Sequence, residues 1–270
     1  MNIIFSIIIF LIGSLIGSFY AAIIEAILNN KSLSTVYSYC TKCGEKLGFF
    51  EKIPIISYIF LKGKCKHCKQ KIASKYIILE IITGLLFLIM AYGLNIINNS
   101  FNITNVVLFL TTILYVSYII LVAGIDKKER NISQPVLTYG IIISIIYIIY
   151  MCIAQTRSIY VNVVYLVIMT LLLLANVIST KKRAQGSYII DLLTMLLIML
   201  IFTGEFICIL TITETLVAIA LYILINKLVG ARNKSKKSRT AFNLNIRMAF
   251  IMGSLNIVTL VILMIYKIFF

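Results

Sequence analysis

Residues 38–46 read SYCTKCGEK and residues 63–71 read GKCKHCKQK, so four cysteines form two pairs in a basic stretch. Each pair, Cys40 with Cys43 and Cys65 with Cys68, has two residues between its thiols, so that one tight turn can present both sulfurs together. Two such turns can surround a Zn²⁺ ion with sulfurs at about 2.3 Å. The gap of 21 residues is slightly longer than the usual zinc spacing of about 15–20. The sequence therefore predicts a small metal-binding domain.

Two disulfides are the alternative use of the same four cysteines. The surrounding segment is rich in lysine, which is typical of loops on the cytoplasmic side, where thiols stay reduced. We therefore prefer a structural Zn²⁺ site. Four sulfur ligands would leave no open position for water, so the metal would stabilise the fold and take no part in catalysis. His67, inside the second pair, is interpreted as a solvated residue.

The rest of the chain is too apolar for a water-soluble globule. Hydrophobic residues make up 61% of the 270 residues, and the mean hydropathy is +1.04. Several runs are long enough to cross about 30 Å of hydrocarbon as helices, and the first is too long for a cleaved signal. These runs cover residues 3–28, 76–94, 105–125, 136–154, 160–179, 188–204, 206–226 and 247–268. We predict an all-α polytopic membrane protein with about eight transmembrane helices, the boundary between the sixth and seventh being the weakest.

Basic residues gather in four of the segments that join these runs. They lie between residues 31 and 75, 127 and 130, 181 and 183, and 227 and 247. Because lysine and arginine mark the cytoplasmic side, all four segments are expected there. The predicted domains are a first transmembrane helix at 1–28, a cytoplasmic four-cysteine zinc-binding domain at 29–75 and a transmembrane domain at 76–270. The net charge of +16 reflects this orientation and attraction to anionic membrane lipid, so nucleic acid is not an expected partner.

The chain contains only two aspartates. Asp126 ends the third apolar run and Asp191 begins the sixth, so both are expected at the cytoplasmic face. A carboxylate at mid-bilayer costs about 2.5–3.5 kcal/mol, so such a residue suggests a function. Two aspartates in contact would share one proton, as in aspartic peptidases. The simpler alternative is that each is an interfacial anchor beside Lys127 or Arg183.

The amino-terminal third, with both cysteine pairs, resembles the amino-terminal domain of type IV prepilin peptidases. Residues 124–141, GIDKKERNISQPVLTYGI, are similar to the segment around that family's first catalytic aspartate, the position that Asp126 takes. The second aspartate of the family lies in a Gly-x-Gly-Asp-x-Lys signature, of which only Asp191 is present here. The other matching residues are Gly17, Ser18, Phe19, Ile53, Pro54, Ser57, Gly63, Ile72, Tyr76 and Glu80.

The resemblance implies a multi-pass aspartic peptidase of the bacterial inner membrane. Such enzymes cleave the short basic leader of type IV prepilin-like precursors, which serve type IV pili and protein secretion. Asp126 and Asp191 would be catalytic, and Cys40, Cys43, Cys65 and Cys68 would hold structural Zn²⁺. Many members then methylate the new amino terminus, so S-adenosylmethionine is a candidate cofactor.

Two other classes of function remain open at this point. One is a non-catalytic membrane scaffold whose zinc knuckle recruits a cytoplasmic partner. The other is a small-solute transporter, which would normally show ionisable residues near the bilayer midplane and a repeated half. Neither of those two transporter features is evident in the sequence.

Four further residues have expected roles. Gly13 and Gly17 form a GxxxG pattern that permits close helix packing. Glu25, near the end of the first run, either lines the site or extends to water. Glu80, early in the second run, either orients the zinc domain or a basic leader, or stabilises the start of its helix.

Overall fold

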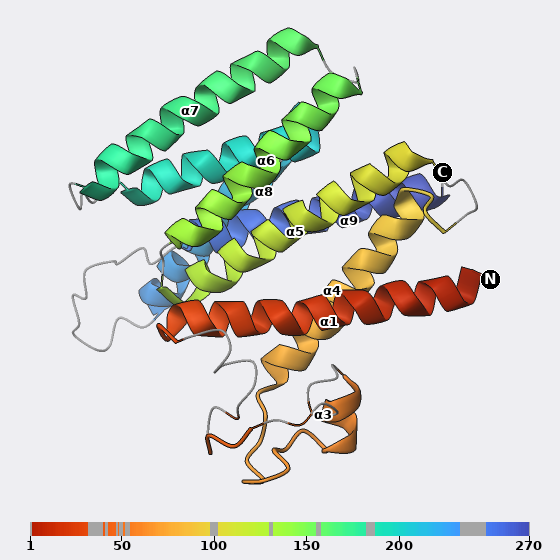
Figure 1. Ribbon diagram of the computed structural model, residues 1–270. Helices are drawn as coiled ribbons and strands as arrows, with labels where there is room; N and C mark the ends of the chain where they lie inside the picture. The colour runs from red at the N-terminus through yellow and green to blue at the C-terminus, as the bar shows by residue number, and fades with distance from the viewer. Residues whose placement is uncertain are drawn as a thin grey trace. The chain divides into compact units, whose positions relative to one another are not determined.

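The computed structural model describes residues 2–31, 40, 43–46, 48, 51, 55–97, 102–129, 132–154, 158–181, 187–232 and 247–269. Regular structure in these residues is helical, with β-pairing limited to bridges such as Lys64 with Lys71. The predicted all-α class is confirmed. In chain order (Figure 1) the helices are α1 (Asn2–Leu28), α3 (Ile56–Phe60), α4 (Ser74–Gly93), α5 (Ile103–Glu129), α6 (Gln134–Ile153), α7 (Ile159–Lys181), α8 (Ser187–Arg232) and α9 (Met248–Phe269).

Among the described residues, six helices are long and apolar enough to cross a membrane: α1, α4, α5, α6, α8 and α9. A shorter apolar helix, Ile159–Ala175, lies within α7. Each of the eight predicted runs is therefore helical. The sixth and seventh runs, expected as separate helices, form α8, which is interrupted only at Gly204 with φ 80 and ψ 173. Glycine adopts this backbone conformation without a steric penalty, which explains why the interruption falls there.

The chain folds into two compact units, Met1–Glu129 with Val261–Phe270, and Arg130–Leu260. In the first unit α1 crosses α4 at close range (Figure 1). A Cβ atom added to Gly13 would lie 2.9 Å from the Cα of Gly84, and one added to Gly17 would lie 3.1 Å from the Cα of Glu80. Side chains at these glycines would push the two helices apart. The GxxxG prediction for α1 is confirmed.

Polar contacts add to the packing of the first unit. The hydroxyls of Ser6 and Tyr92 hydrogen-bond at 2.7 Å between α1 and α4. A second hydroxyl pair, Tyr20 with Ser117, joins α1 to α5. Such hydrogen bonds are a common way to hold apolar helices together, because lipid offers no competing partner.

The second unit contains α6, α7, α8 and the first part of α9. The rings of Tyr147 in α6 and Phe202 in α8 stack with centroids 4.5 Å apart. Asn256 of α9 donates from its side-chain amide to the hydroxyl of Thr211 at 3.1 Å. The hydroxyl of Thr259 donates to the carboxylate of Glu214 at 2.9 Å. These two contacts, the first buried and the second partly buried, lie one turn apart and fix α9 against α8.

Candidate metal centre and catalytic aspartates

The first cysteine pair folds into a tight turn. The backbone N–H of Cys40 donates to the carbonyl of Glu45 at 2.8 Å, and the N–H of Gly44 donates back to the carbonyl of Cys40 at 2.9 Å. Gly44 has a φ of 74, the left-handed conformation that closes the turn. Cys43 lies inside this turn, so its thiol is held close to that of Cys40.

The second pair repeats the same turn. The N–H of Cys65 donates to the carbonyl of Gln70 at 2.9 Å, and the N–H of Lys69 donates to the carbonyl of Cys65 at 3.0 Å. Lys69 takes the place of the glycine and has a φ of 57. A lysine has a steric penalty in this conformation, so the turn must be stabilised by what it holds together. The repeated geometry is that of two metal-binding knuckles.

The two turns bring their four sulfurs into one cluster. The sulfurs of Cys40, Cys43, Cys65 and Cys68 all lie within 4.8 Å of one another. Sulfurs at about 2.3 Å from a tetrahedral Zn²⁺ would be about 3.8 Å apart, so a small contraction would suffice to coordinate the ion. None of these four cysteines is joined in a disulfide, which argues against the disulfide alternative. The donor set therefore fits a structural metal, and His67 is exposed and takes no part in the cluster.

The pKa of the Cys43 thiol is shifted by its place in the cluster. The backbone N–H of Glu45 hydrogen-bonds to this sulfur and lowers its pKa, but desolvation and the neighbouring thiols of Cys40 and Cys68 outweigh it and raise the pKa to about 11. The Cys43 thiol therefore keeps its proton unless a cation lies nearby. A divalent metal would supply that charge and displace the protons.

The carboxylate of Glu80 connects the four-cysteine segment to helices α1 and α4. Glu80 is the seventh residue of α4, and its Oε2 accepts a hydrogen bond from the backbone N–H of Ile55 at 2.9 Å. The side chain of Ser18 in α1 also hydrogen-bonds to this carboxylate. Ile55 directly precedes α3, so one buried acid contacts α1, α4 and the loop before α3. Of the roles expected for Glu80, this arrangement matches orientation of the zinc domain.

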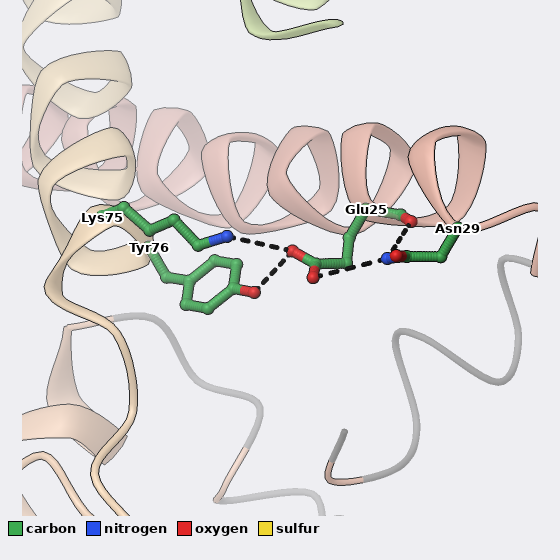
Figure 2. A network of polar contacts seen from close by, with 4 residues as sticks. All are labelled: Glu25, Asn29, Lys75 and Tyr76. Carbon is green, nitrogen blue, oxygen red and sulfur yellow. Dashed lines mark hydrogen bonds and ion pairs between the residues drawn. The ribbon is translucent and has the colours of Figure 1, made fainter. Parts of the chain in front are cut away.

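Glu25 forms a second polar network at the end of α1 (Figure 2). Its Oε2 accepts a hydrogen bond from the hydroxyl of Tyr76 at 2.5 Å and forms an ion pair with Lys75 at 3.2 Å. Asn29 donates to the backbone carbonyl of Glu25 at 2.8 Å. Glu25 was expected to line a site or to extend to water, whereas the structure uses it to join the end of α1 to the start of α4.

The two aspartates are both buried. Asp126 ends the apolar span Ile103–Asp126 of α5 and has no exposed surface. Asp191 is the fifth residue of α8 and is 1% exposed. Asp126 belongs to the first unit and Asp191 to the second. Each takes part in polar interactions in the structure. Complete burial of a carboxyl at a helix end is unlike a simple interfacial anchor, which would reach water.

Comparison with known proteins finds similarity in the first part of the chain. Residues 11–94 match the family model described as "Bacterial Peptidase A24 N-terminal domain". The match includes both cysteine pairs, Glu25 and Glu80. The resemblance to type IV prepilin peptidases is confirmed. The matched region holds the four-cysteine segment together with α4 and most of α1.

Three relatives named "Prepilin leader peptidase/N-methyltransferase" show how far this likeness reaches. A Myxococcus xanthus protein is 34% identical over 83 residues, which is 31% of this chain and 25% of that protein. A Vibrio cholerae protein is 46% identical over 44 residues, 16% of this chain and 17% of its own length. A Klebsiella pneumoniae protein is 32% identical over 89 residues, 31% of this chain and 39% of its own length. The matched stretch thus spans well under half of each relative, and no solved structure matches the chain.

Proposed function

We propose that this chain is a membrane aspartic peptidase that removes the basic leader of type IV prepilin-like precursors at the cytoplasmic face of the bacterial inner membrane. The observation that carries the proposal is the match of residues 11–94 to the peptidase A24 amino-terminal domain. Three further observations support it: the six span-length helices, the four-cysteine cluster and the two buried aspartates.

Asp126 and Asp191 are the proposed catalytic pair. Two carboxyls in contact cannot both ionise cheaply, so they hold one proton between them. The ionised carboxylate removes a proton from water as that water attacks the scissile carbonyl. The protonated carboxyl polarises the same carbonyl and then donates its proton to the leaving amine. Both side chains are buried, as a site that keeps bulk water away from the reacting groups requires.

The zinc-binding segment has a structural role in this proposal. Cys40, Cys43, Cys65 and Cys68 would hold one Zn²⁺, and the bound metal would stabilise the domain by linking its two turns. Glu80 and Ser18 keep the domain against α1 and α4. A precursor with an apolar helix would lie beside the enzyme's own helices in the membrane, which would leave its leader at the cytoplasmic surface.

A cleavage assay tests this function. The chain would be co-expressed with a type IV prepilin-like precursor, and the amino terminus of the product would be measured by mass spectrometry. We expect a product that begins directly after the leader. Only the intact precursor, in cells where the chain is inserted in the membrane and carries metal, would contradict the proposal.

The same mass spectrum also shows whether the new amino terminus is methylated. The three relatives carry N-methyltransferase in their names, so we propose that the new amino terminus receives one methyl group from S-adenosylmethionine. A product heavier by one methyl group supports the second activity. A mature but unmethylated product in methionine-fed cells would restrict the function to cleavage.

A further inference from the structure

The helix inside the zinc-binding segment has an exposed apolar tip. α3 spans only Ile56–Phe60, and its last two side chains, Ile59 and Phe60, are 65% and 81% exposed. They are not covered by any described part of their own unit. An exposed aromatic beside an exposed aliphatic residue is costly in water, so such a tip indicates a contact surface.

Lysines follow this tip closely in the sequence. All lysines between residues 61 and 75 are exposed, and two of them form ion pairs, Lys66 with Glu51 at 3.9 Å and Lys75 with Glu25 at 3.2 Å. Apolar side chains among cations are typical of surfaces that enter the interface of anionic membranes, where the lysines meet lipid phosphates. The lysines are Lys62, Lys64, Lys66, Lys69, Lys71 and Lys75.

The hydrogen bond between Ile55 and Glu80 sets the depth of α3. Glu80 lies six residues beyond Ser74, the first residue of α4, which is about 9 Å along the helix axis. Ile55 contacts Glu80 at that level. The five residues of α3 span about 8 Å. Phe60, at the end of α3, therefore stays within about 8 Å of the point where Ile55 contacts α4. The tip is therefore near the membrane surface.

Charge distinguishes between the two partners that this surface could bind, a basic leader peptide and an anionic membrane. A basic leader peptide would be repelled by the other four lysines, at positions 62, 64, 69 and 71, whereas anionic headgroups are attracted by them. We propose that α3 is a membrane-surface anchor. Phe60 and Ile59 enter the boundary between headgroups and acyl chains, and the four lysines outside the two ion pairs bind anionic phospholipid. This anchor does not depend on the proposed peptidase activity.

The chain contains no tryptophan, which makes a direct test simple. The full-length variant Phe60→Trp would be placed in nanodiscs of phosphatidylglycerol and phosphatidylcholine, with and without bromine on the acyl chains. We expect blue-shifted emission that brominated lipid quenches. The matched control is Tyr58→Trp on the same helix, because the Tyr58 ring lies so close to Gly63 that a Cβ there would be 2.9 Å away. Its indole should stay among protein atoms and be quenched much less.

A charge-reversal variant tests the lipid specificity. Adding Lys62→Glu and Lys64→Glu to Phe60→Trp should reduce quenching in phosphatidylglycerol discs, with metal content unchanged as the check on folding. Emission typical of an indole in water, without quenching, would overturn the proposal. Burial of the indole only after a prepilin is added would overturn it too, because the surface would then serve the substrate. Equal quenching in pure phosphatidylcholine would refute the part assigned to anionic lipid.

Discussion

Glu80 in α4 accepts a hydrogen bond from the backbone N–H of Ile55 at 2.9 Å, across 25 positions of sequence. Ile55 has a φ of 59, a conformation that a β-branched residue rarely adopts. Backbone strain of this kind costs about 1–3 kcal/mol and persists only where the surrounding structure compensates for it. The buried carboxyl group of Glu80 supplies that compensation, so it holds the four-cysteine segment on α1 and α4.

Glu80→Ala should therefore destabilise the amino-terminal module by about 1–3 kcal/mol, because the N–H of Ile55 loses its acceptor. The loss should show as a lower thermal unfolding midpoint in detergent and as faster proteolysis within residues 29–75. Glu205→Ala, which removes an exposed acid from α8, is the control and should change neither measurement. Equal behaviour of the two variants would rule out the proposed link.

Gly17→Val should separate α1 from α4. A Cβ at this position meets the hydroxyl of Thr83 and lies 3.1 Å from the Cα of Glu80, so the helices must move apart. We expect a loss of about 1–3 kcal/mol in stability, measured as a shift of the unfolding midpoint. Leu15→Val, at a 46% exposed position on the same helix, should cost much less. Similar shifts for both variants would show that the close approach is not required.

Cys65→Ser should abolish metal binding. The purified protein is expected to contain one Zn²⁺ per chain by elemental mass spectrometry, and the variant should fall to background because one of four ligands is lost. Cys152→Ser is the matched control, since that thiol lies in α6 and its contact is with Asn162. Zinc retained in Cys65→Ser, or lost equally from both variants, would contradict the assignment.

Tyr76→Phe should weaken the contact between the end of α1 and the start of α4 by about 0.5–1.5 kcal/mol, because the hydroxyl that donates to Glu25 is removed. Combining it with Glu25→Gln in a double-mutant cycle would isolate the pair from the neighbouring Lys75. Tyr160→Phe, at an 81% exposed tyrosine, should leave the unfolding midpoint unchanged. A coupling energy of zero in the cycle would mean that the two side chains act independently.

Most of the fold was predictable because it depends on local properties. A run of apolar residues long enough to cross a membrane must be helical there, since lipid offers no partner for the backbone. Two cysteines with two residues between them close a turn by themselves, so the knuckles followed from spacing alone. The interruption at Gly204 was marked only as a weak boundary, because a single glycine does not reveal whether the helix ends or continues past it.

The long-range contacts were not predictable to the same degree. Glu80 and Glu25 were recognised as unusual acids in apolar runs, but their partners Ile55 and Tyr76 lie 25 and 51 positions away and are brought close by helix packing. The exposure of Phe60 could not be predicted from the sequence either, since phenylalanine is found both in cores and on surfaces. The pairing of Asp126 with Asp191 stays a prediction of the same long-range kind.

The rate of prepilin cleavage by aspartate variants tests the central claim most directly. Purified wild type, Asp126→Asn and Asp191→Asn would be compared in detergent with Glu205→Gln, which also removes one acid charge but at an exposed position. Each asparagine variant should lose about 10²–10⁴-fold in rate, because neither can exchange the shared proton, while Glu205→Gln keeps wild-type activity. Full cleavage by either asparagine variant, with zinc content and unfolding midpoint unchanged, would contradict the catalytic pair.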